Sequence, residues 1–345
     1  MNGISIILCC HNSSERLPKT LEALARLTLP DNVPVELVLV NNASTDHTAS
    51  IAEALWASYS SPPLLRVIEE PQPGVLFARI KGIAAAKYEL VVFCDDDNWL
   101  AEDYLLNAWE RMSGNPRIGA LGGRGIAESE IPLPEWFEAN KTGFACGEQW
   151  PRTGICTNRM YLWGAGLVTR KSILVKVFDP QFPMVLTGHK ENLALAGDDM
   201  EICKRIILLG YDLFYDSSLV YHHFIEANRL TLDYLENQNR GVLQAIPIQR
   251  FYSFFIIRQK VPGGLLPIVF IWNTYLYLLL KLGFPVGKRK PIINFFKVCS
   301  EGVRKEGKFH TEYFQIKAFV RKVQKTKIEL STDDTDYTDK HQSHL

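Results

Sequence analysis

The 345-residue chain lacks the glycine patterns by which two common classes of nucleotide-binding protein are recognised. No G-x-G-x-x-G follows its first apolar run, and no G-x-x-x-x-G-K-[ST] occurs anywhere in it. The first absence argues against a dinucleotide site of the nicotinamide type, and the second argues against a phosphate-binding loop.

Paired cysteines are also missing. The seven cysteines are odd in number and scattered, and no two of them form a Cys-x-x-Cys pair. This pattern predicts free thiols in a reducing compartment and disfavours both disulfides and structural zinc. The first ten residues carry no positively charged segment and no apolar run of leader length, so we expect no secretory signal and a cytosolic active site.

The chain has no net charge, because 38 basic residues balance 38 acidic ones. The two signs are nevertheless separated along the sequence. Residues 241–330 carry 16 Lys and Arg against 4 acidic residues, whereas residues 1–240 carry an acidic excess. A basic region of this kind usually has a polyanionic partner, either nucleic acid or anionic lipid.

Three consecutive carboxylates, Asp95, Asp96 and Asp97, follow the apolar run at 91–94. Side chains alternate along an extended chain, so Asp95 and Asp97 are expected on one face and Asp96 on the other. Neighbouring carboxylates repel each other unless a cation lies beside them, which favours Mg²⁺ or Mn²⁺. The alternative is a solvated acidic turn that caps a helix starting near Glu102, and the spacing alone does not decide between them.

Apolar runs and helical periodicities alternate along the first hundred residues. We expect strands at 3–10, 35–40, 65–68 and 91–94, and helices that carry Leu17 to Leu27, Ile51 to Leu55, and residues 74–86. This order predicts a parallel, doubly wound α/β sheet with helices on both faces, in which ligands bind beyond the carboxyl ends of the strands. The polar loops 11–14, 41–46 and 95–98 would all lie on that edge.

Six segments, taken in order, resemble the family 2 glycosyltransferases of the GT-A fold. They are ISIILCCHN, LVLVNNASTD, GVLFARIKGI, VVFCDDD, WGAGLVTRKSIL and GDDMEICKRI. The resemblance covers roughly residues 1–240. It implies a GT-A type, mostly parallel sheet and a metal-dependent hexosyltransferase that uses Mn²⁺ or Mg²⁺ and moves a sugar from a nucleotide sugar with inversion at the anomeric carbon.

On the donor side, Asp95 and Asp97 match the two ends of the family's Asp-x-Asp motif. The resemblance implies that Asp95 faces the ribose, that Asp97 ligates the metal, and that Asp96 between them belongs to the nucleotide-sugar site. Arg79 matches an arginine on the nucleotide side, although Ile80 stands where the family often has Asn.

The base-binding side is expected from the first two polar loops. Asn41 and Asn42 occupy the place of an acidic pair that contacts the base, and Asp46 matches the Asp at the end of that motif. Asn keeps an acceptor oxygen and adds donors, so it removes a charge without removing base recognition. His11 and Asn12 complete the expected nucleotide-sugar contacts.

The acceptor side is expected to contain Trp163, Gly164 and Ala165, which resemble the family's Gly-rich segment, together with Asp198. The family's Glu-Asp motif falls on Asp198 and Asp199, which implies that Asp199 is the general base for the acceptor hydroxyl. A purely structural interpretation remains open here. Asp198 is a good helix N-cap, and Asp199 in the first turn favours the helix dipole.

Two later segments carry smaller expectations. His222 and His223 are adjacent in an expected strand, so at most one can enter the site, and we predict that His222 contacts the metal or the diphosphate. A partly buried, hydrogen-bonded histidine is the alternative. Residues 238–240 are only faintly similar to the Gln-x-x-Arg-Trp motif of processive synthases and lack the Trp, which favours single-sugar transfer.

The sequence predicts three parts: a catalytic domain at 1–240, a basic helical region at 241–330 and a disordered acidic tail at 331–345. The uncharged run 265–280 would span about 24 Å as a helix, which is shorter than the roughly 30 Å of a bilayer core. Extending it to residue 287 adds Lys281 and Pro285. We expect an interfacial helix on the cytoplasmic face of the inner or plasma membrane, and a spanning or buried core helix remains open.

Together with these patterns, the resemblance implies a non-processive glycosyltransferase that favours UDP-sugars and acts on a lipid-linked glycan of cell-surface polysaccharide synthesis. One alternative is a noncatalytic nucleotide-sugar-binding homologue, which would keep Asp95 and Asp97 but would not need Asp199. The other is a nucleic-acid-binding protein that uses the basic region, although the sequence shows no interleaved aromatic and basic motif.

Overall fold

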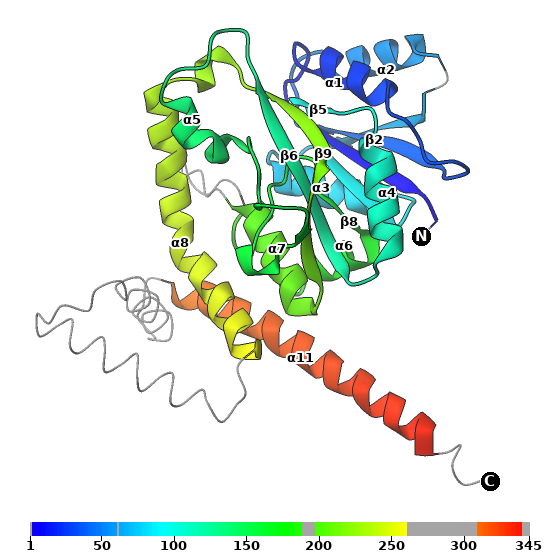
Figure 1. Ribbon diagram of the computed structural model, residues 1–345, viewed down its shortest axis with the longest axis vertical. Coiled ribbons are helices and arrows are strands. Elements are labelled where there is room, and N and C mark those ends of the chain that lie inside the picture. The colour runs from blue at the N-terminus through cyan, green and yellow to red at the C-terminus, as the bar shows by residue number, and fades with distance from the viewer. Residues whose placement is uncertain (1, 61, 188–196, 261–308, 340–345) are drawn as a thin grey trace, which may run out of the picture. The chain divides into compact units, whose positions relative to one another are not determined.

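The computed structural model describes residues 2–60, 62–187, 197–260 and 309–339, with side chains described up to residue 326 (Figure 1). The chain forms two compact units. The first is Met1–Asp179 with Leu186–Ala245, and the second is Pro180–Val185 with Ile246–Leu345.

The first unit is built on a nine-stranded sheet in the order β3-β2-β1-β4-β8-β6-β9-β5, with β7 paired to β9. Its strands are β1 (Ile4–Cys10), β2 (Val35–Asn42), β3 (Leu64–Glu70), β4 (Leu90–Asp95), β5 (Asn98–Leu100), β6 (Ile118–Glu128), β7 (Gly154–Ile155), β8 (Val168–Arg170) and β9 (Asp212–Phe224). Strands β1 to β4 are parallel, which confirms the expected doubly wound half. Beyond β4 the sheet is mixed, because β8 pairs antiparallel with both β4 and β6.

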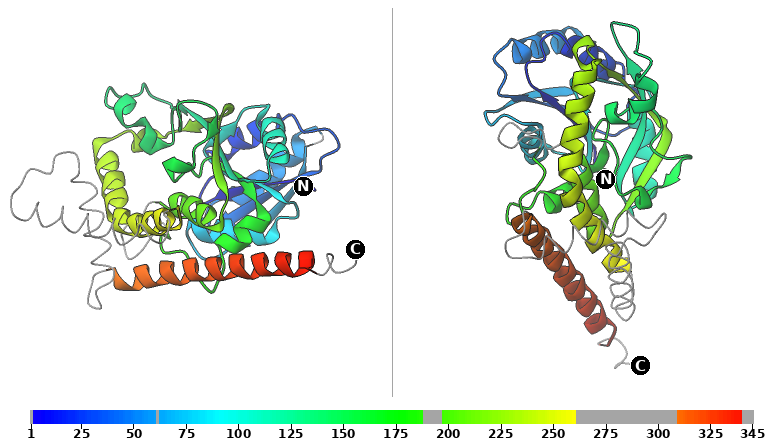
Figure 2. Two further views of the ribbon diagram at one scale, coloured as in Figure 1. Left: turned by 60° about the horizontal axis from the view of Figure 1, so that its bottom comes forward. Right: turned by 90° about the vertical axis from the view of Figure 1, so that its left-hand side faces the viewer.

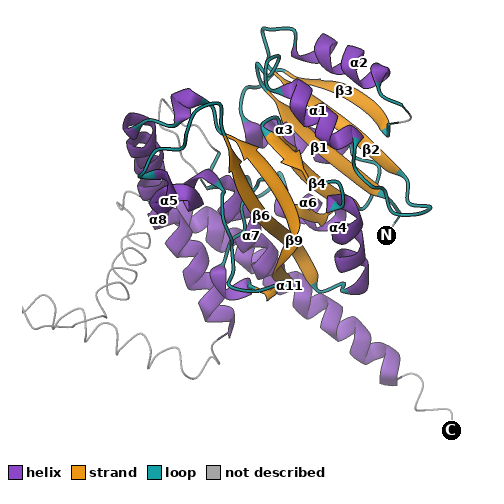
Figure 3. Ribbon diagram, turned by 45° about the horizontal axis from the view of Figure 1, so that its top comes forward, coloured by secondary structure: helices purple, strands orange, loops and turns teal. Residues whose placement is uncertain are grey.

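Helices cover both faces of this sheet (Figure 3). They are α1 (Leu17–Ala25), α2 (Thr48–Ser58), α3 (Val75–Ala85), α4 (Tyr104–Gly114), the short α5 (Phe137–Asn140), α6 (Lys171–Val177) and α7 (Asp198–Leu209). Three 3₁₀ turns join them at η1 (Lys141–Phe144), η2 (Thr157–Arg159) and η3 (Ala227–Arg229). With both faces covered, the central strands are apolar at nearly every position, as expected for a parallel sheet.

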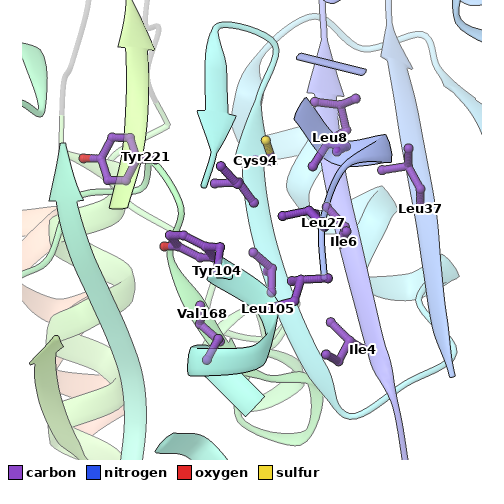
Figure 4. Packing of buried hydrophobic residues seen from close by; sticks show 14 of the residues in the cluster. Ile4, Ile6, Leu8, Leu27, Leu37, Cys94, Tyr104, Leu105, Val168 and Tyr221 are labelled. Carbon is purple, nitrogen blue, oxygen red and sulfur yellow. The ribbon is translucent and has the colours of Figure 1, made fainter. Parts of the chain in front are cut away.

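The period of two in the central strands divides the core between the two faces. Ile4, Ile6 and Leu8 of β1 pack in one cluster with Leu37 of β2 and the inner residues of α1 and α4 (Figure 4). In α1, Leu17, Leu21 and Leu24 are buried at helical spacing, as the sequence predicts. Burying one such leucine side chain stabilises the fold by about 1.5–3 kcal/mol.

The opposite face of β1 meets α3 at Gly82. A Cβ built on Gly82 would lie 2.4 Å from Ile7 Cγ2 and 3.2 Å from Val40 Cγ2. Glycine therefore permits an approach between helix and sheet that a larger residue would prevent. This packing fixes the position of α3 beside β1 and β2.

The register of the parallel strands sets where the loops lie. Cys9 of β1 is paired with Asp95 at the end of β4, and Cys10 is paired with Asn41 near the end of β2. The carboxyl ends of β1, β2 and β4 consequently meet at one edge. Asn41 and Asn42 belong to β2 and not to the loop in which the sequence placed them. The strand expected to carry His222 and His223 is the 13-residue strand β9.

The second unit contains the end of α8 (Leu232–Lys260) and α11 (His310–Asp339), drawn in yellow and orange-red in Figure 2. Phe251 packs edge-on against Tyr313 with ring centroids 5.3 Å apart, and Phe182 packs against Phe319 at 6.1 Å. The helical character expected of the C-terminal part is confirmed over these residues.

Two expectations for the C-terminal part have different outcomes. Helix α11 continues through residues 331–339, where the sequence analysis predicted disorder. Adding residues to an existing helix costs far less than starting one, so a helix can extend into a segment of poor intrinsic propensity. The apolar segment 265–287 lies outside the described residues. Among the residues that are described, no helix is long and apolar enough to cross a membrane.

Candidate active site

A cavity of about 1080 Å³ opens at the carboxyl ends of the parallel strands. It lies where open α/β sheets usually bind their ligands. The lining comes from the loops after β1 and β4, the start of α3, the 3₁₀ turn before β7, the segment before β8, the start of α7 and the end of β9. Its members include Cys9, His11, Arg16, Asn42, Arg79, Asp95, Asp96, Asp97, Gly143, Trp163, Gly164, Ala165, Asp198, Asp199, His223, Arg229 and Tyr234.

All three consecutive carboxylates line this cavity. The prediction that Asp96 points away is wrong, because β4 ends at Asp95 and the next two residues form a turn in which strand alternation no longer holds. Each carboxylate has a basic neighbour. Arg79 Nη2 lies 3.7 Å from Asp95 Oδ1, Arg16 Nη2 lies 2.8 Å from Asp96 Oδ2, and Arg229 Nη1 lies 2.9 Å from Asp97 Oδ2.

Burial and these cations act on the carboxylates in opposite directions. Burial raises the pKa of Asp95 to about 6 despite the nearby Arg79. Burial would also raise the pKa of Asp97, but His223 and Arg229 outweigh it and lower that pKa to about 2. Asp97 is therefore the carboxylate of the two that is firmly ionised, as a metal ligand must be.

Because side chains alternate along β9, one of its two adjacent histidines lies in the cavity, as expected. That histidine is His223 and not His222. Its Nε2 lies 3.3 Å from Asp97 Oδ2, and its Nδ1 donates to the backbone oxygen of Phe144 at 2.6 Å. His222 faces the other side and pairs with Glu128 at 2.7 Å. The prediction that His222 enters the site is wrong, because the sequence did not show which face of β9 meets the cavity.

The residues present fit a divalent metal ion whose ligands come partly from the protein and partly from the substrate. In the described part of the chain no three His, Cys, Asp or Glu side chains converge as a metal cage. Mg²⁺ commonly uses only one or two carboxylates and completes its shell with water and substrate phosphates. Asp97, with His223 beside it, offers such a partial site within the cavity.

Asn42 lines the cavity, and its amide group is fixed by the backbone. The Nδ2 atom donates to the oxygens of Glu70 and Gln72, at 3.0 and 2.6 Å, and Oδ1 accepts from Gly74 N at 2.8 Å. The donors that Asn adds relative to Asp are thus used by the loop, and Oδ1, which already accepts one hydrogen bond, can accept one more. His11 Nδ1 donates to the backbone oxygen of Asn42 at 2.7 Å, which ties the loop after β1 to the end of β2.

Three other residues expected here do not line the cavity. Asn41 donates to both carboxylate oxygens of Glu69 at 3.0 Å, and Asn12 accepts from Thr45 N at 2.8 Å. Asp46 accepts from the backbone of Ser14 at 3.0 Å. Asn41 thus links β2 to β3, while Asn12 and Asp46 link the loops after β1 and β2, and a contact of these residues with the nucleotide stays a prediction.

The second acidic pair begins α7, and it does not cap the helix. The N-cap is Gly197, whose φ of 117° is one that glycine adopts freely, and no side-chain capping bond is present there. The carboxylate of Asp198 accepts from Arg79 Nη1 at 2.5 Å. Asp199 accepts from the backbone N–H of Gly164 at 3.3 Å and of Met200 at 2.7 Å.

Burial, reinforced by the adjacent Asp198, raises the pKa of Asp199 to about 6, while Arg79 opposes the rise. A carboxylate with such a pKa is ionised at neutral pH and is a stronger base than an ordinary aspartate. This is the property required of a general base. Asp199 also lines the cavity, next to the expected acceptor residues Trp163, Gly164 and Ala165.

Sequence reasoning missed three lining residues that contribute polar contacts. Arg16, at the start of α1, joins Asp96 to Glu226 at 2.8 and 2.9 Å. Arg229 of η3 holds Asp97 and also donates to the hydroxyl of Tyr234 at 3.1 Å. None of the three lies in a sequence motif. The sequence indicated only that five clustered carboxylates require positively charged neighbours, and not which residues supply them.

The family model described as "Glycosyl transferase family 2" matches residues 5–177. A poly-beta-1,6-N-acetyl-D-glucosamine synthase of Staphylococcus epidermidis is 31% identical over 123 residues, which are 36% of this chain and 28% of that protein. A putative glycosyltransferase of Bacillus subtilis, EpsH, is 33% identical over 102 residues, which are 30% of this chain and 28% of that protein. The matches thus span little more than a quarter of these relatives' length.

The solved structures of S. aureus TarS residues 1–349 are similar to this chain over nearly its whole length. One has a TM-score of 0.51 at 16% identity and covers 95% of this chain and 91% of that one. Another, in complex with UDP-GlcNAc, has a TM-score of 0.54 at 16% identity, with coverages of 95% and 92%. At this identity the likeness concerns the fold, and it confirms the predicted GT-A type architecture.

Proposed function

The chain belongs to glycosyl transferase family 2, and on that premise we propose that it moves one sugar from a nucleotide sugar, preferably a UDP-sugar, to an acceptor hydroxyl with inversion. The observation that carries this proposal is a single cavity lined by Asp95 to Asp97 from one side of the sequence and by Asp198 and Asp199 from the other. The first group suits a nucleotide diphosphate with its metal, and the second suits an acceptor.

The preference for UDP rests on the fixed acceptor at the base-binding corner. Asn42 Oδ1 can accept a hydrogen bond, and both donor hydrogens of the same amide group are already used by the loop. The imide N3–H of uracil can donate to such an acceptor, whereas the N3 of cytosine is itself an acceptor. A similar protein, TarS, has been solved in complex with UDP-GlcNAc, which makes that compound the first donor to test.

Cations around the diphosphate position would support the leaving group. Arg16, Arg229 and His223 line the cavity, and although burial opposes the charge on His223, Asp97 raises the pKa of His223 to about 10. A bound Mn²⁺ or Mg²⁺, held by Asp97, would supply Lewis-acid stabilisation of the departing diphosphate. Metal dependence is part of this proposal.

Asp199 would accept the proton of the acceptor hydroxyl as its oxygen attacks the anomeric carbon. One base and one stabilised leaving group suffice for a single displacement, which inverts the configuration. The backbone N–H groups of Gly164 and Met200 hold the carboxylate in place. Because the base must be ionised, activity should be present above pH 6 and be lost as the pH falls through about 6.

The acceptor and the setting extend the proposal further. The S. epidermidis relative is a polysaccharide synthase, and the absent Trp of the processive motif supports single transfers. We include a lipid-linked glycan as acceptor and the cytoplasmic membrane face as location, supported by the basic excess of residues 241–330. The noncatalytic alternative gives no role to a buried carboxylate poised as Asp199 is.

The test is hydrolysis and transfer of radiolabelled UDP-GlcNAc with Mn²⁺, comparing the full chain with Asp199→Asn. We expect the variant to bind UDP with unchanged affinity and to lose turnover by about 10²–10⁴-fold, since it keeps its shape but cannot take the proton. Isothermal titration of UDP serves as the control for folding and donor binding. A folded Asp199→Asn protein with normal turnover would overturn the base assignment, and a wild-type chain that binds UDP-GlcNAc without any turnover would favour the noncatalytic alternative.

A further inference from the structure

Arg79 occupies an unusual position for a residue expected to contact a nucleotide. It projects from α3, is only 5% exposed, and lines the cavity. Its Nη1 donates to Asp198 Oδ2 at 2.5 Å, and its Nη2 lies 3.7 Å from Asp95 Oδ1. One guanidinium group therefore links the carboxylate that ends β4 to the carboxylate that begins α7.

The surroundings of the guanidinium group hold it toward α7. Its central carbon lies 5.4 Å from the centroid of the Phe93 ring. On another side is Gly164, where an added Cβ would lie 2.7 Å from Nη2. The same Gly164 donates its backbone N–H to Asp199 at 3.3 Å. Gly164 thus makes room for the cation and also holds the base.

The charges around Asp199 indicate what this cation does there. Asp198 raises the pKa of Asp199, and Arg79 lowers it. Tyr221 and Cys203 also face Asp199, but burial raises the pKa of both, so they are neutral at physiological pH. The backbone N–H groups of Met200 and Gly164 complete the described surroundings. Arg79 is the full positive charge that offsets Asp198.

We propose that Arg79 is a positioning residue for the general base: it clamps Asp198 and supplies the charge that keeps Asp199 ionised and aimed at the acceptor. This assignment rests on the proposed role of Asp199. It moves Arg79 from the nucleotide side, where the family resemblance put it, to the acceptor side. Of its two carboxylate contacts, the short one is with Asp198 on the acceptor side, and the one with Asp95 is more than 1 Å longer.

The test combines two variants of Arg79 with a pH profile of UDP-GlcNAc hydrolysis by the full chain. Arg79→Gln keeps the approximate shape of the side chain and removes its charge. In this variant the acidic limb of the profile, where hydrolysis falls as the pH is lowered, should move up by at least about one pH unit. The rate of hydrolysis should be tenfold or more below that of the wild type at pH 7 and should recover at pH 9. In Arg79→Lys, which keeps the charge, the limb should move by less than about half a unit. UDP affinity should stay within about threefold in both, since the side chain does not bind the nucleotide.

Two further variants make the outcome specific. Arg111 pairs with Asp216 at 2.7 Å and lies 5.0 Å from the Phe214 ring centroid, outside the cavity, so Arg111→Gln is a matched control that should leave the limb unchanged. Gly164→Ala would displace the guanidinium group sterically without changing any charge, and should move the limb in the same direction as Arg79→Gln. It also provides the measurement if Arg79→Gln does not fold.

Difference infrared titration of the carboxyl band that Asp199→Asn removes reports the protonation of Asp199 without turnover. The band should titrate at higher pH in Arg79→Gln than in the wild type. A tenfold or greater loss of UDP affinity with an unmoved limb would show that Arg79 is a nucleotide ligand and would overturn the inference. Failure of the proposed function looks different, because the acidic limb would then survive in Asp199→Asn whatever Arg79 does.

Discussion

His223 lies beside Asp97 in the cavity, and the adjacent residue His222 provides a control for experiments on it. His223 Nε2 lies 3.3 Å from Asp97 Oδ2 inside the cavity, whereas His222 pairs with Glu128 outside it. The two residues are adjacent in β9, so substitutions at them disturb the same strand. A comparison between them therefore separates chemistry at the cavity from a general effect on the sheet.

We expect His223→Gln to weaken Mn²⁺-dependent UDP binding by about 10–100-fold, because a histidine hydrogen-bonded to a metal-binding carboxylate fixes the orientation of that carboxylate. His222→Gln should change it by less than about twofold, as a partly exposed substitution remote from the site does. Calorimetric titration of UDP at a series of Mn²⁺ concentrations measures both. Equal losses in the two variants would contradict the assignment of His223 to the site.

Residue-level prediction succeeded where a motif and its position on an element agreed. Asp95, Asp97 and Asp199 were placed correctly in the cavity, because they lie at or next to the end of β4 or the start of α7, whose periods are clear in the sequence. Trp163, in the irregular segment before β8, was placed there by the family resemblance. Arg16 and Arg229 could not be found in this way. They belong to a helix start and a 3₁₀ turn with no pattern of their own, and only the tertiary fold brings them to the carboxylates.

At the scale of elements, the connection between β3 and α3 depends on the amide group of Asn42. Its two donor hydrogens are used by the backbone oxygens of Glu70 and Gln72, and its oxygen accepts from Gly74 N. A carboxylate at this position would face two carbonyl oxygens with no hydrogen to offer them. The acidic residue that the family resemblance placed here is thus incompatible with this loop.

Accordingly, Asn42→Asp should destabilise the protein by about 1–3 kcal/mol, because buried acceptors are left facing one another. Asn12→Asp is the matched control. The oxygen of Asn12 accepts from Thr45 N at 2.8 Å, a bond that Asp also makes, so its effect should lie within about 0.5 kcal/mol. Urea unfolding followed by circular dichroism measures both. An Asn42→Asp variant with unchanged stability would show that the loop does not depend on the two donor hydrogens of Asn42.

The elements of the first half were predictable from the sequence, and those of the second half were less so. Strands β1, β2 and β4 are buried on both faces and consist of nearly continuous apolar runs. The short strands β5 and β7 gave no periodic signal, because they contain three and two residues. For β9, the sequence showed two apolar stretches, and the pairing with β6 across two register shifts joins them into one strand.

For the whole molecule, the separated charges remain the strongest basis for a location. Residues 241–330 carry 16 basic and 4 acidic residues, and the uncharged run 265–280 lies between basic residues 260 and 281. Each basic residue near an anionic membrane surface contributes about 1 kcal/mol, and this contribution is screened by salt. An apolar segment in the interface is insensitive to salt.

We therefore expect the full chain to float with anionic liposomes at low salt, to float less at high salt, and to bind neutral liposomes weakly. Density-gradient flotation measures the bound fraction. Replacing Lys288, Arg289 and Lys290 by Gln should reduce binding to anionic vesicles at low salt and leave binding to neutral vesicles unchanged. A full-length protein that stays at the bottom of the gradient at low salt would refute the membrane location.

The contact of Gly82 with Ile7 and Val40 has a consequence beyond packing. Gly82 and Arg79 lie one turn apart on α3, so the depth to which the helix sinks onto the sheet also sets the reach of the guanidinium group toward α7. A methyl group gained at residue 82, or one lost at residue 7, would shift the cation while touching nothing in the cavity. Natural variants could thus adjust the acidity at which the enzyme works through its core, and an engineer seeking a different pH optimum could leave the site itself untouched.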